Sequence, residues 1–249
     1  MASIVLHYCV FTAANFKTTG MNGRVEIYNE IINPVLHKSD DTPVLLLLDK
    51  PLLPLQRQYN VLFKRAFDII VSSTAVLFIL TWLVPLIACI IKLNSKGPVF
   101  FVQKRNKKNG EIFNCIKFRT MVVNADADRK GAYEDDQRIT SVGNFFRKTH
   151  LDELPQFFNV LKGDMSFVGP RPYMVAENRR NETTIASYRL RHDVKPGITG
   201  LAQSLGHYGF TEDANMLKAR LDMDLYYIHH WSLKMDMIII LRTFVNLFR

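Results

Sequence analysis

Cysteine is scarce in this sequence, which has only Cys9, Cys89 and Cys115 among 249 residues. They form no Cys-x-x-Cys pair, so a disulfide framework is excluded, and free thiols in a reducing compartment are the simplest interpretation. The sequence also lacks Walker A, His-Glu-x-x-His and zinc-finger patterns. The adjacent pair His229-His230 does not supply a metal site, because neighbouring side chains point to different sides of a helix or strand.

Acidic residues are also fewer than basic ones. The chain has 32 Lys and Arg against 23 Asp and Glu, a formal net charge of +9. Residues 1–60 carry five groups of each sign, so the whole excess lies in residues 61–249, and Lys92–Lys130 alone carries ten basic and three acidic groups. This balance indicates a polyanionic partner, which is a nucleic acid, an anionic membrane surface or a phosphorylated substrate.

Charge is absent altogether from residues 69–91. Twenty-three helical residues span roughly 35 Å, compared with a hydrocarbon core of about 30 Å, so we expect this run to enter a membrane. Two topologies stay open: a spanning helix, and a re-entrant helix that enters and leaves by the same face. Pro85 interrupts the run, and basic residues flank both ends, namely Lys64, Arg65, Lys92 and Lys96. Because positive flanks tend to stay in the cytoplasm, these features favour re-entry.

One hairpin is expected after the apolar run, in a sequence that otherwise indicates helices. Val99–Gln103 and Ile112–Phe118 have the pattern of strands, and Asn109-Gly110 between them is typical of a hairpin turn. Loops are expected at Gly163–Pro172 and Lys195–Gly209. The sequence therefore predicts a mainly α protein with a small β-hairpin, an α+β fold.

The two ends of the chain are less defined. Residues 1–60 have no continuous pattern, which suggests an N-terminal extension or the remnant of a larger region. Trp231–Arg249 has the pattern of an amphipathic helix, which suits either a membrane interface or the protein core.

An acidic pair, Asp152-Glu153, stands at the predicted start of a helix. Apolar residues at 154, 157, 158 and 161 follow helical spacing, and Gly163 suits the C-terminal cap. One interpretation is structural, with Asp152 or Thr149 as the N-cap. The other is chemical: a carboxylate kept ionised by the helix dipole and by Arg147 can attack a phosphorus atom or hold a metal ion.

Three further segments present cations that suit phosphate. Lys117 and Arg119 would share one face of a strand. Arg171 lies between two prolines, which makes a stiff loop that suits bidentate phosphate binding. Lys195 stands at the entrance of a Gly/Pro loop, Lys195–Gly200. A solvated surface residue is the alternative at each position.

Taken together and in this order, the motifs resemble those of bacterial sugar transferases, the monotopic phosphoglycosyl transferases that begin lipid-linked glycan assembly. The resemblance runs from about Leu62 to the C-terminus. The segments that carry it are Lys64–Asp68, Lys96–Phe100, Lys117–Met121, Asp136–Thr140, Leu151–Gln156, Phe158–Ser166, Gly169–Pro172 and Lys195–Gly200.

The resemblance implies a bacterial sugar transferase domain over residues 61–249. Its re-entrant helix, at about residues 62–93, would be broken near Pro85, and its catalytic part, residues 94–249, would lie on the cytoplasmic face of the bacterial inner membrane. Asp152 would attack the β-phosphate of a UDP-sugar, release UMP and hold a phosphosugar, which passes to undecaprenyl phosphate. Glu153, and Asp152 as a further ligand, would hold Mg²⁺. The candidate phosphate ligands are Lys117, Arg119, Arg147, Arg171 and Lys195.

The sequence departs from the family pattern at three positions. Relatives usually carry Trp at Leu201, Arg at Tyr208 and Asn at His230, so sugar selectivity and the level of activity stay open. The alternative function is a catalytically impaired scaffold that recruits downstream glycosyltransferases to the membrane surface. A nucleic-acid partner is not expected, because the apolar run is long and no nucleic-acid module is present.

Overall fold

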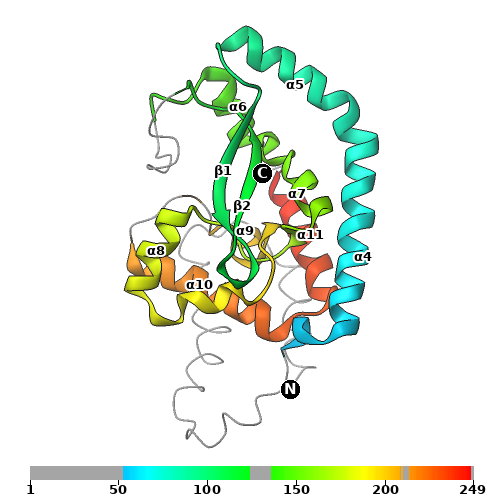
Figure 1. The fold of residues 1–249 in the computed structure, drawn as a ribbon, viewed down its shortest axis with the longest axis vertical. Coiled ribbons are helices and arrows are strands. Elements are labelled where there is room, and N and C mark those ends of the chain that lie inside the picture. The colour runs from blue at the N-terminus through cyan, green and yellow to red at the C-terminus, as the bar shows by residue number, and fades with distance from the viewer. Residues whose placement is uncertain (1–52, 124–135, 208, 210–212, 248–249) are drawn as a thin grey trace, which may run out of the picture. The chain divides into compact units, whose positions relative to one another are not determined.

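The computed structural model describes a large part of the chain, namely residues 53–123, 136–207, 209 and 213–247 (Figure 1). Every described residue belongs to one compact unit, Pro51–Arg249. Most of the expected N-terminal extension, residues 1–60, therefore lies outside the described residues. Its last part is folded, because Pro54–Gln56 forms a 3₁₀ turn whose Leu55 is buried in a hydrophobic core.

A single long helix is formed by α4 (Gln58–Ala75), a π-helical segment (Val76–Leu80) and α5 (Thr81–Asn94). It is long and apolar enough, by length and composition, to cross a membrane. Figure 1 shows the helix curving between α4 and α5, where the π segment disturbs the hydrogen-bond ladder and Pro85 removes a donor. The apolar helix expected over residues 62–93 is thus confirmed, and its length is compatible with spanning and with re-entry alike.

The predicted hairpin is confirmed. β1 (Phe100–Asn106) pairs antiparallel with β2 (Ile112–Phe118), in a register that sets Phe100 against Phe118. Asn109 and Gly110 both adopt positive φ angles, 61° and 76°, which is the geometry that the Asn-Gly pair favours. β1 extends further than expected, because its second half also pairs with β2.

A second pair of strands was not expected. β3 (Ser166–Val168) pairs in parallel with β4 (Gly197–Thr199), in segments that the sequence indicates as loops. Glycine allows this pairing, since a Cβ atom on Gly197 would lie 2.1 Å from the backbone nitrogen of Gly169. Three-residue strands joined by a long connection leave no periodic signal in the sequence.

The remaining described elements are helical. They are α6 (Ser141–Lys148), a 3₁₀ turn (Leu151–Glu153), α7 (Gln156–Lys162), α8 (Val175–Thr184), a 3₁₀ segment (Ala186–Asp193), α9 (Leu201–Ser204), α10 (Ala214–His230) and α11 (Leu233–Leu247). The predicted helix end at Gly163 is confirmed, because this residue caps α7 with φ 94°. The mainly α fold with a small antiparallel sheet is therefore confirmed.

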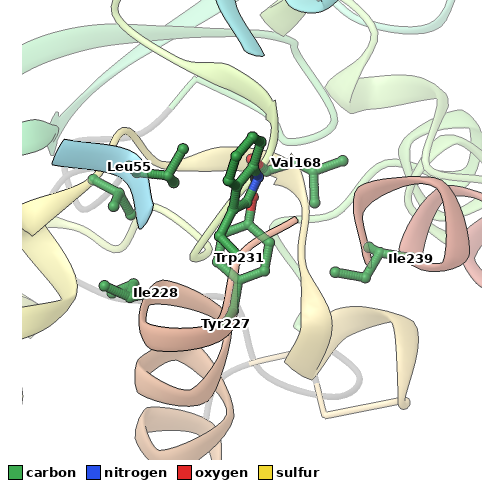
Figure 2. Close-up of a cluster of buried hydrophobic side chains, with 7 residues drawn as sticks. Leu55, Val168, Tyr227, Ile228, Trp231 and Ile239 are labelled. Carbon is green, nitrogen blue, oxygen red and sulfur yellow. The ribbon is translucent and has the colours of Figure 1, made fainter. Parts of the chain in front are cut away.

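The main hydrophobic core lies where α10, α11 and β3 meet (Figure 2). Tyr227, Ile228 and Trp231 come from the end of α10, and they pack with Val168 of β3 and with Ile239 of α11. The core interpretation of the C-terminal helix is confirmed in part, and the membrane-interface interpretation stays a prediction. Ile239 is buried on one face of α11, whereas large apolar side chains on another face are exposed, namely Leu233, Met237, Leu241, Phe244 and Val245.

A buried ion pair joins the apolar helix to this core. The Lys64 Nζ of α4 lies 2.7 Å from Oδ2 of Asp236 in α11, and the Asp236 side chain is fully buried. Tyr227 donates its hydroxyl hydrogen to Asp236 Oδ1 at 2.8 Å, and Trp231 donates its indole N–H to Oδ2 at 3.1 Å. Three donors thus satisfy one carboxylate, which is the condition for a tolerable buried charge.

We predict that Asp236→Asn lowers the free energy of unfolding by about 3–5 kcal/mol, because it leaves the Lys64 ammonium group buried beside a neutral partner. Thermal unfolding of the purified full chain in neutral detergent measures this loss. The double variant Lys64→Met/Asp236→Leu should recover most of it, and the exposed Glu111→Gln should unfold like the wild type. A single variant as stable as the wild type would contradict this role of the ion pair.

Candidate active site

A cavity of about 760 Å³ opens between the β-hairpin, the acidic turn and α11. Both members of the acidic pair line it, and so do the cations Lys117, Arg147 and Arg171. Another part of its wall is apolar, with Phe157, Phe167, Ile198, Ile240 and Phe244. One side of the cavity, here called the polar floor, is therefore lined by these charged residues, and the other side is an apolar wall that includes α11.

The acidic pair lies in the 3₁₀ turn Leu151–Glu153, which follows the left-handed residue His150 (φ 56°) and precedes α7. Pro155 occupies the N-cap position of α7 and no side chain caps it. The hydroxyl of Thr149 donates instead to the carbonyl of Phe145, at the end of α6. The interpretation of Asp152 or Thr149 as a helix cap is therefore wrong. The burial of the Asp152 and Glu153 carboxylates needs another explanation.

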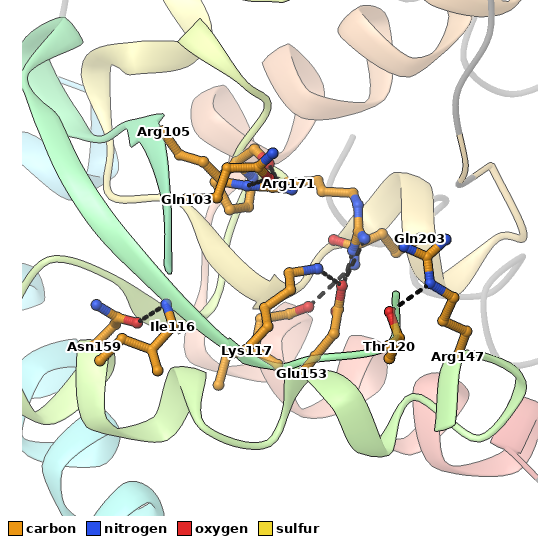
Figure 3. Close-up of polar contacts among 12 residues, drawn as sticks. Gln103, Arg105, Ile116, Lys117, Thr120, Arg147, Glu153, Asn159, Arg171 and Gln203 are labelled. Carbon is orange, nitrogen blue, oxygen red and sulfur yellow. Dashed lines mark hydrogen bonds and ion pairs between the residues drawn. The ribbon is translucent and has the colours of Figure 1, made fainter. Parts of the chain in front are cut away.

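The α7 helix is held against the hairpin by one amide side chain. Asn159 accepts a hydrogen bond from the backbone N–H of Ile116 at 3.0 Å and donates to the carbonyl of Asn114 at 2.7 Å. Figure 3 shows Asn159 beside the edge of β2 and Lys117 on the same strand. This docking brings the acidic turn to the end of β2, where Lys117 stands.

Glu153 is clamped by two cations. Lys117 Nζ lies 2.5 Å from its Oε1, and Arg171 donates to Oε1 at 2.7 Å and to Oε2 at 3.3 Å (Figure 3). Burial alone would raise the pKa of Glu153, but the charges of Arg171 and Lys117 outweigh it and hold this pKa well below its usual value. Glu153 is therefore a fixed anion that orients both cations.

Asp152 is in the opposite situation. Its side chain is buried, it lines the cavity, and it makes no hydrogen bond or ion pair with any residue that the structure describes. Burial raises the pKa of Asp152, against the nearby charge of Lys117, and Glu153 adds to the increase. A buried carboxylate with no partner is costly to the fold, and such groups are concentrated at reactive sites.

Arg147 completes the polar floor from α6. It donates Nε–H to the hydroxyl of Thr120 at 2.9 Å (Figure 3), and burial lowers its pKa. The structure thus brings together Asp152 and Glu153 with four of the five predicted phosphate ligands, namely Lys117, Arg119, Arg147 and Arg171.

Arg119 and Lys195 are placed differently. Arg119 borders the cavity, but its guanidinium donates to the carbonyls of Ser95, Lys96 and Pro98 and to the Ser95 hydroxyl. It therefore fastens the end of α5 to the end of β2, although both Arg119 and Lys117 line the cavity. Lys195 does not line this cavity and lies in a second, smaller pocket. Phosphate binding by these two residues stays a prediction.

Two arginines that sequence reasoning missed hold the Arg171 loop. Arg191, fully buried, donates to the carbonyl of Arg171 at 2.7 Å and to Asp224 Oδ2 at 2.7 Å. Arg105 donates to the carbonyl of Pro172 and to Gln103 Oε1. The alternation of Gln103 and Arg105 along β1 is a signal that could have indicated Arg105. Arg191 gave no such signal, because it lies in a 3₁₀ segment without periodicity.

Two of the three residues that depart from the family pattern, Leu201 and His230, are described by the structure, and neither borders the cavity. Leu201 packs against the main hydrophobic core, and His230 donates its Nδ1–H to the carbonyl of Tyr226 and stacks on the Tyr226 ring. Tyr208 lies outside the described residues.

A magnesium ion would have few protein ligands here. Among the described residues no group of three or more His, Cys, Asp or Glu side chains is arranged to hold a metal ion. Asp152 has unused hard oxygen donors, which fits a Mg²⁺ ion held by one or two carboxylates and by substrate phosphates. Both oxygens of Glu153 are already bound by cations, so Asp152 is the better-placed ligand of the two.

The cavity places two carboxylates and several cations in the same compact unit as a helix that is long and apolar enough to cross a membrane. The bacterial sugar transferase family profile matches residues 59–249. A UDP-glucose:undecaprenyl-phosphate glucose-1-phosphate transferase of Klebsiella pneumoniae is 46% identical over 202 residues, which cover 81% of this chain and 42% of the relative. The chain accordingly belongs to the bacterial sugar transferase family.

Other relatives differ in length and in the sugar they are named for. A protein of Caulobacter vibrioides with the same name as the Klebsiella relative is 40% identical over 223 residues, 87% of this chain and 83% of the relative. A UDP-N-acetylgalactosamine-undecaprenyl-phosphate N-acetylgalactosaminephosphotransferase of Aeromonas hydrophila is 42% identical over 182 residues, 72% of this chain and 42% of the relative. The chain thus spans less than half the length of two of these relatives and most of the third.

The two neighbouring carboxylates should affect stability in opposite directions. A raised folded-state pKa means that the charge of Asp152 destabilises the fold above its usual pKa of 3.8, and this penalty disappears as the pH falls below that value. Asp152→Asn should therefore raise the free energy of unfolding at pH 7 by about 1 kcal/mol, with a gain that shrinks toward pH 4.

Glu153→Gln is the matched comparison. The lowered pKa means that the charge of Glu153 stabilises the fold above its usual pKa of 4.5 and that this contribution is lost as the pH falls through the lowered value. We expect the variant to lose about 3 kcal/mol at pH 7, because Lys117 and Arg171 keep their charges. Thermal unfolding of both variants across this pH range measures the difference, and shifts of the same sign would contradict it.

Proposed function

We propose that this protein transfers a sugar 1-phosphate from a UDP-sugar to undecaprenyl phosphate at the membrane surface. The observation that carries the proposal is that the two acidic side chains have different environments. Asp152 is buried, without a partner among the described residues, and open to the cavity, whereas Glu153 holds Lys117 and Arg171 in place. The names of the relatives support the class of substrate and of acceptor.

In the first step, an Asp152 carboxylate oxygen attacks the β-phosphorus of the UDP-sugar. The new O–P bond forms as the bond between the β-phosphorus and the bridging oxygen breaks, and UMP leaves with that oxygen and its electron pair. Arg147, Lys117 and Arg171 stand around the same cavity, where they offset the repulsion between the carboxylate and the phosphates. Mg²⁺, when bound through Asp152 and substrate oxygens, would add positive charge to the phosphates.

In the second step, a phosphate oxygen of undecaprenyl phosphate attacks the phosphorus atom of the phosphosugar on Asp152. The bond to Asp152 breaks, the free carboxylate returns, and the product is undecaprenyl diphosphate-sugar. Both steps take place at the Asp152 carboxylate. The departing UMP of the first step and the attacking lipid phosphate of the second can therefore bind the same cations in turn. One cavity of about 760 Å³ is consistent with this alternation.

The acceptor is a lipid, and the long helix offers the means to reach it. Large apolar side chains are exposed along it, including Leu77, Phe78, Trp82 and Leu86. We propose that the helix re-enters the cytoplasmic face of the inner membrane, with the bend of the π segment and Pro85 at its deepest part. The flanking cations would then stay at the cytoplasmic head groups.

Glucose is the first donor to test, because the Klebsiella and Caulobacter relatives are both named for it. The name of the Aeromonas relative makes an N-acetylated sugar the second. A scaffold without catalysis is disfavoured by the open carboxylate of Asp152. Recruitment of downstream glycosyltransferases stays a prediction.

Asp152→Asn should abolish transfer, because an amide cannot form the acyl phosphate link. We expect UMP release from UDP-glucose with undecaprenyl phosphate to fall by about 10³-fold or more. Without the acceptor, the wild type should release one equivalent of UMP and gain the mass of a hexose phosphate, which the variant should not. Glu111→Gln serves as the control, and normal turnover by Asp152→Asn would exclude this residue as the nucleophile.

The topology can be tested separately from the chemistry. In a variant whose three cysteines are replaced by serine, single cysteines at Gln58 and Asn94 stand at the two exposed ends of the long helix. We expect an impermeant maleimide to label both in inverted membrane vesicles and neither in intact spheroplasts. Labelling of the two positions from opposite sides would show a spanning helix.

A further inference from the structure

A second, small pocket lies apart from the active-site cavity. It has a volume of about 70 Å³ and is formed by α4, the turn of the β-hairpin, β3 and the segment before β4. Its lining includes four cations. Lys64 is paired with Asp236, and the other three are Arg65, Lys108 and Lys195. None of these residues borders the larger cavity, so the proposed sugar transfer does not use them.

Two of the cations converge on one point. A Cβ atom built on Gly163 would lie 3.7 Å from Arg65 Nη2 and also 3.7 Å from Lys195 Nζ. Arg65 is held there because it donates to the carbonyls of Val160 and Leu161, at 2.6 and 2.7 Å, at the end of α7. The ammonium groups of Lys108 and Lys195 make no hydrogen bond or ion pair with any described residue.

The carboxylates nearby are engaged at some of their oxygens. Asp68, the one carboxylate in the lining, accepts hydrogen bonds on Oδ1 from the Ser166 hydroxyl at 3.0 Å and from the Phe167 N–H at 2.9 Å. Asp164 pairs with Lys107 at 2.9 Å and with Lys162 at 3.6 Å. Burial, and after it the charge of Arg65, lowers the pKa of Lys195, and the charges of Asp68 and Asp164 only partly oppose this. An anion in the pocket would relieve this repulsion.

The pocket also borders a surface suited to a membrane. Val61, one helical turn before Arg65, belongs to its lining and is 44% exposed. The next two residues, Leu62 and Phe63, are 70% and 67% exposed, and the uncharged run begins four residues after Arg65. A cation cluster beside exposed apolar side chains is the arrangement that binds lipid head groups.

We infer that Arg65, Lys108 and Lys195 form a binding site for a single phosphate group, contributed by an anionic phospholipid of the surrounding membrane. The volume accommodates a phosphate and not a nucleotide. Such a site would fix the height of α4 at the head-group level. It differs from the site of the transferred phosphates, so it does not depend on the proposed reaction.

Lipid binding to charge-removing variants tests this site. The purified full chain in neutral detergent is titrated with dioleoylphosphatidylglycerol, and the first bound lipid is counted by native mass spectrometry. Lys195→Gln and Lys108→Gln should each weaken this binding about fivefold, the equivalent of roughly 1 kcal/mol for each cation near a phosphate surface. Lys218→Gln, an exposed lysine of α10, is the charge-matched control and should bind like the wild type.

A second arm distinguishes the sources of phosphate. Inorganic phosphate should not displace the lipid at equal concentration, because it lacks the acyl chains that lie against Val61 and Leu62. If inorganic phosphate displaced the lipid from the wild type but not from Lys195→Gln, the pocket would still be a phosphate site, but its assignment to a lipid would be overturned. Equal lipid affinity of the wild type and both pocket variants, with unfolding temperatures unchanged, would overturn the site itself.

Discussion

The clamp on Glu153 is the interaction on which the site depends. It joins three segments that are distant in the sequence, since Lys117 comes from the hairpin, Glu153 from the turn before α7 and Arg171 from the loop after β3. Each cation alone would repel the other in a buried place, and the carboxylate between them removes that cost. The same contact leaves Asp152, the preceding residue, facing the cavity without a partner among the described residues.

Three basic side chains attach the apolar helix to the rest of the described unit, each in a different way. Lys64 forms the buried pair with Asp236, Arg65 binds the carbonyls that end α7, and Arg119 binds the carbonyls that follow α5. The attachments lie near both ends of the long helix, so its middle is left to expose apolar side chains. In the re-entrant topology proposed above, a helix held at its two ends in this way would keep the cavity at a constant distance from the membrane surface.

Local signals in the sequence were enough to predict the elements that depend on local chemistry. The Asn109-Gly110 turn identified the hairpin, and the apolar spacing together with Gly163 identified α7. Residues 166–168 and 197–199 gave no such signal, because their pairing depends on backbone contact between segments distant in the chain. Alternation along β2 suggested that Lys117 and Arg119 act together, but Arg119 follows the last residue of the strand and turns to the carbonyls after α5. The sequence also could not show that Lys195 faces a different pocket from Arg171.

In the proposed mechanism, the contrast between Asp152 and Glu153 accounts for the presence of two acids at this position and for their order. A nucleophilic carboxylate must be free of strong hydrogen bonds, because each bond lowers the energy of its lone pairs and must break before attack. A carboxylate that organises cations must make those bonds permanently. One side chain cannot satisfy both requirements, and in a 3₁₀ turn two successive side chains point in different directions. The turn therefore aims Asp152 at the cavity while Glu153 reaches Lys117 and Arg171, and exchanging the two residues would leave the same charges with neither geometry.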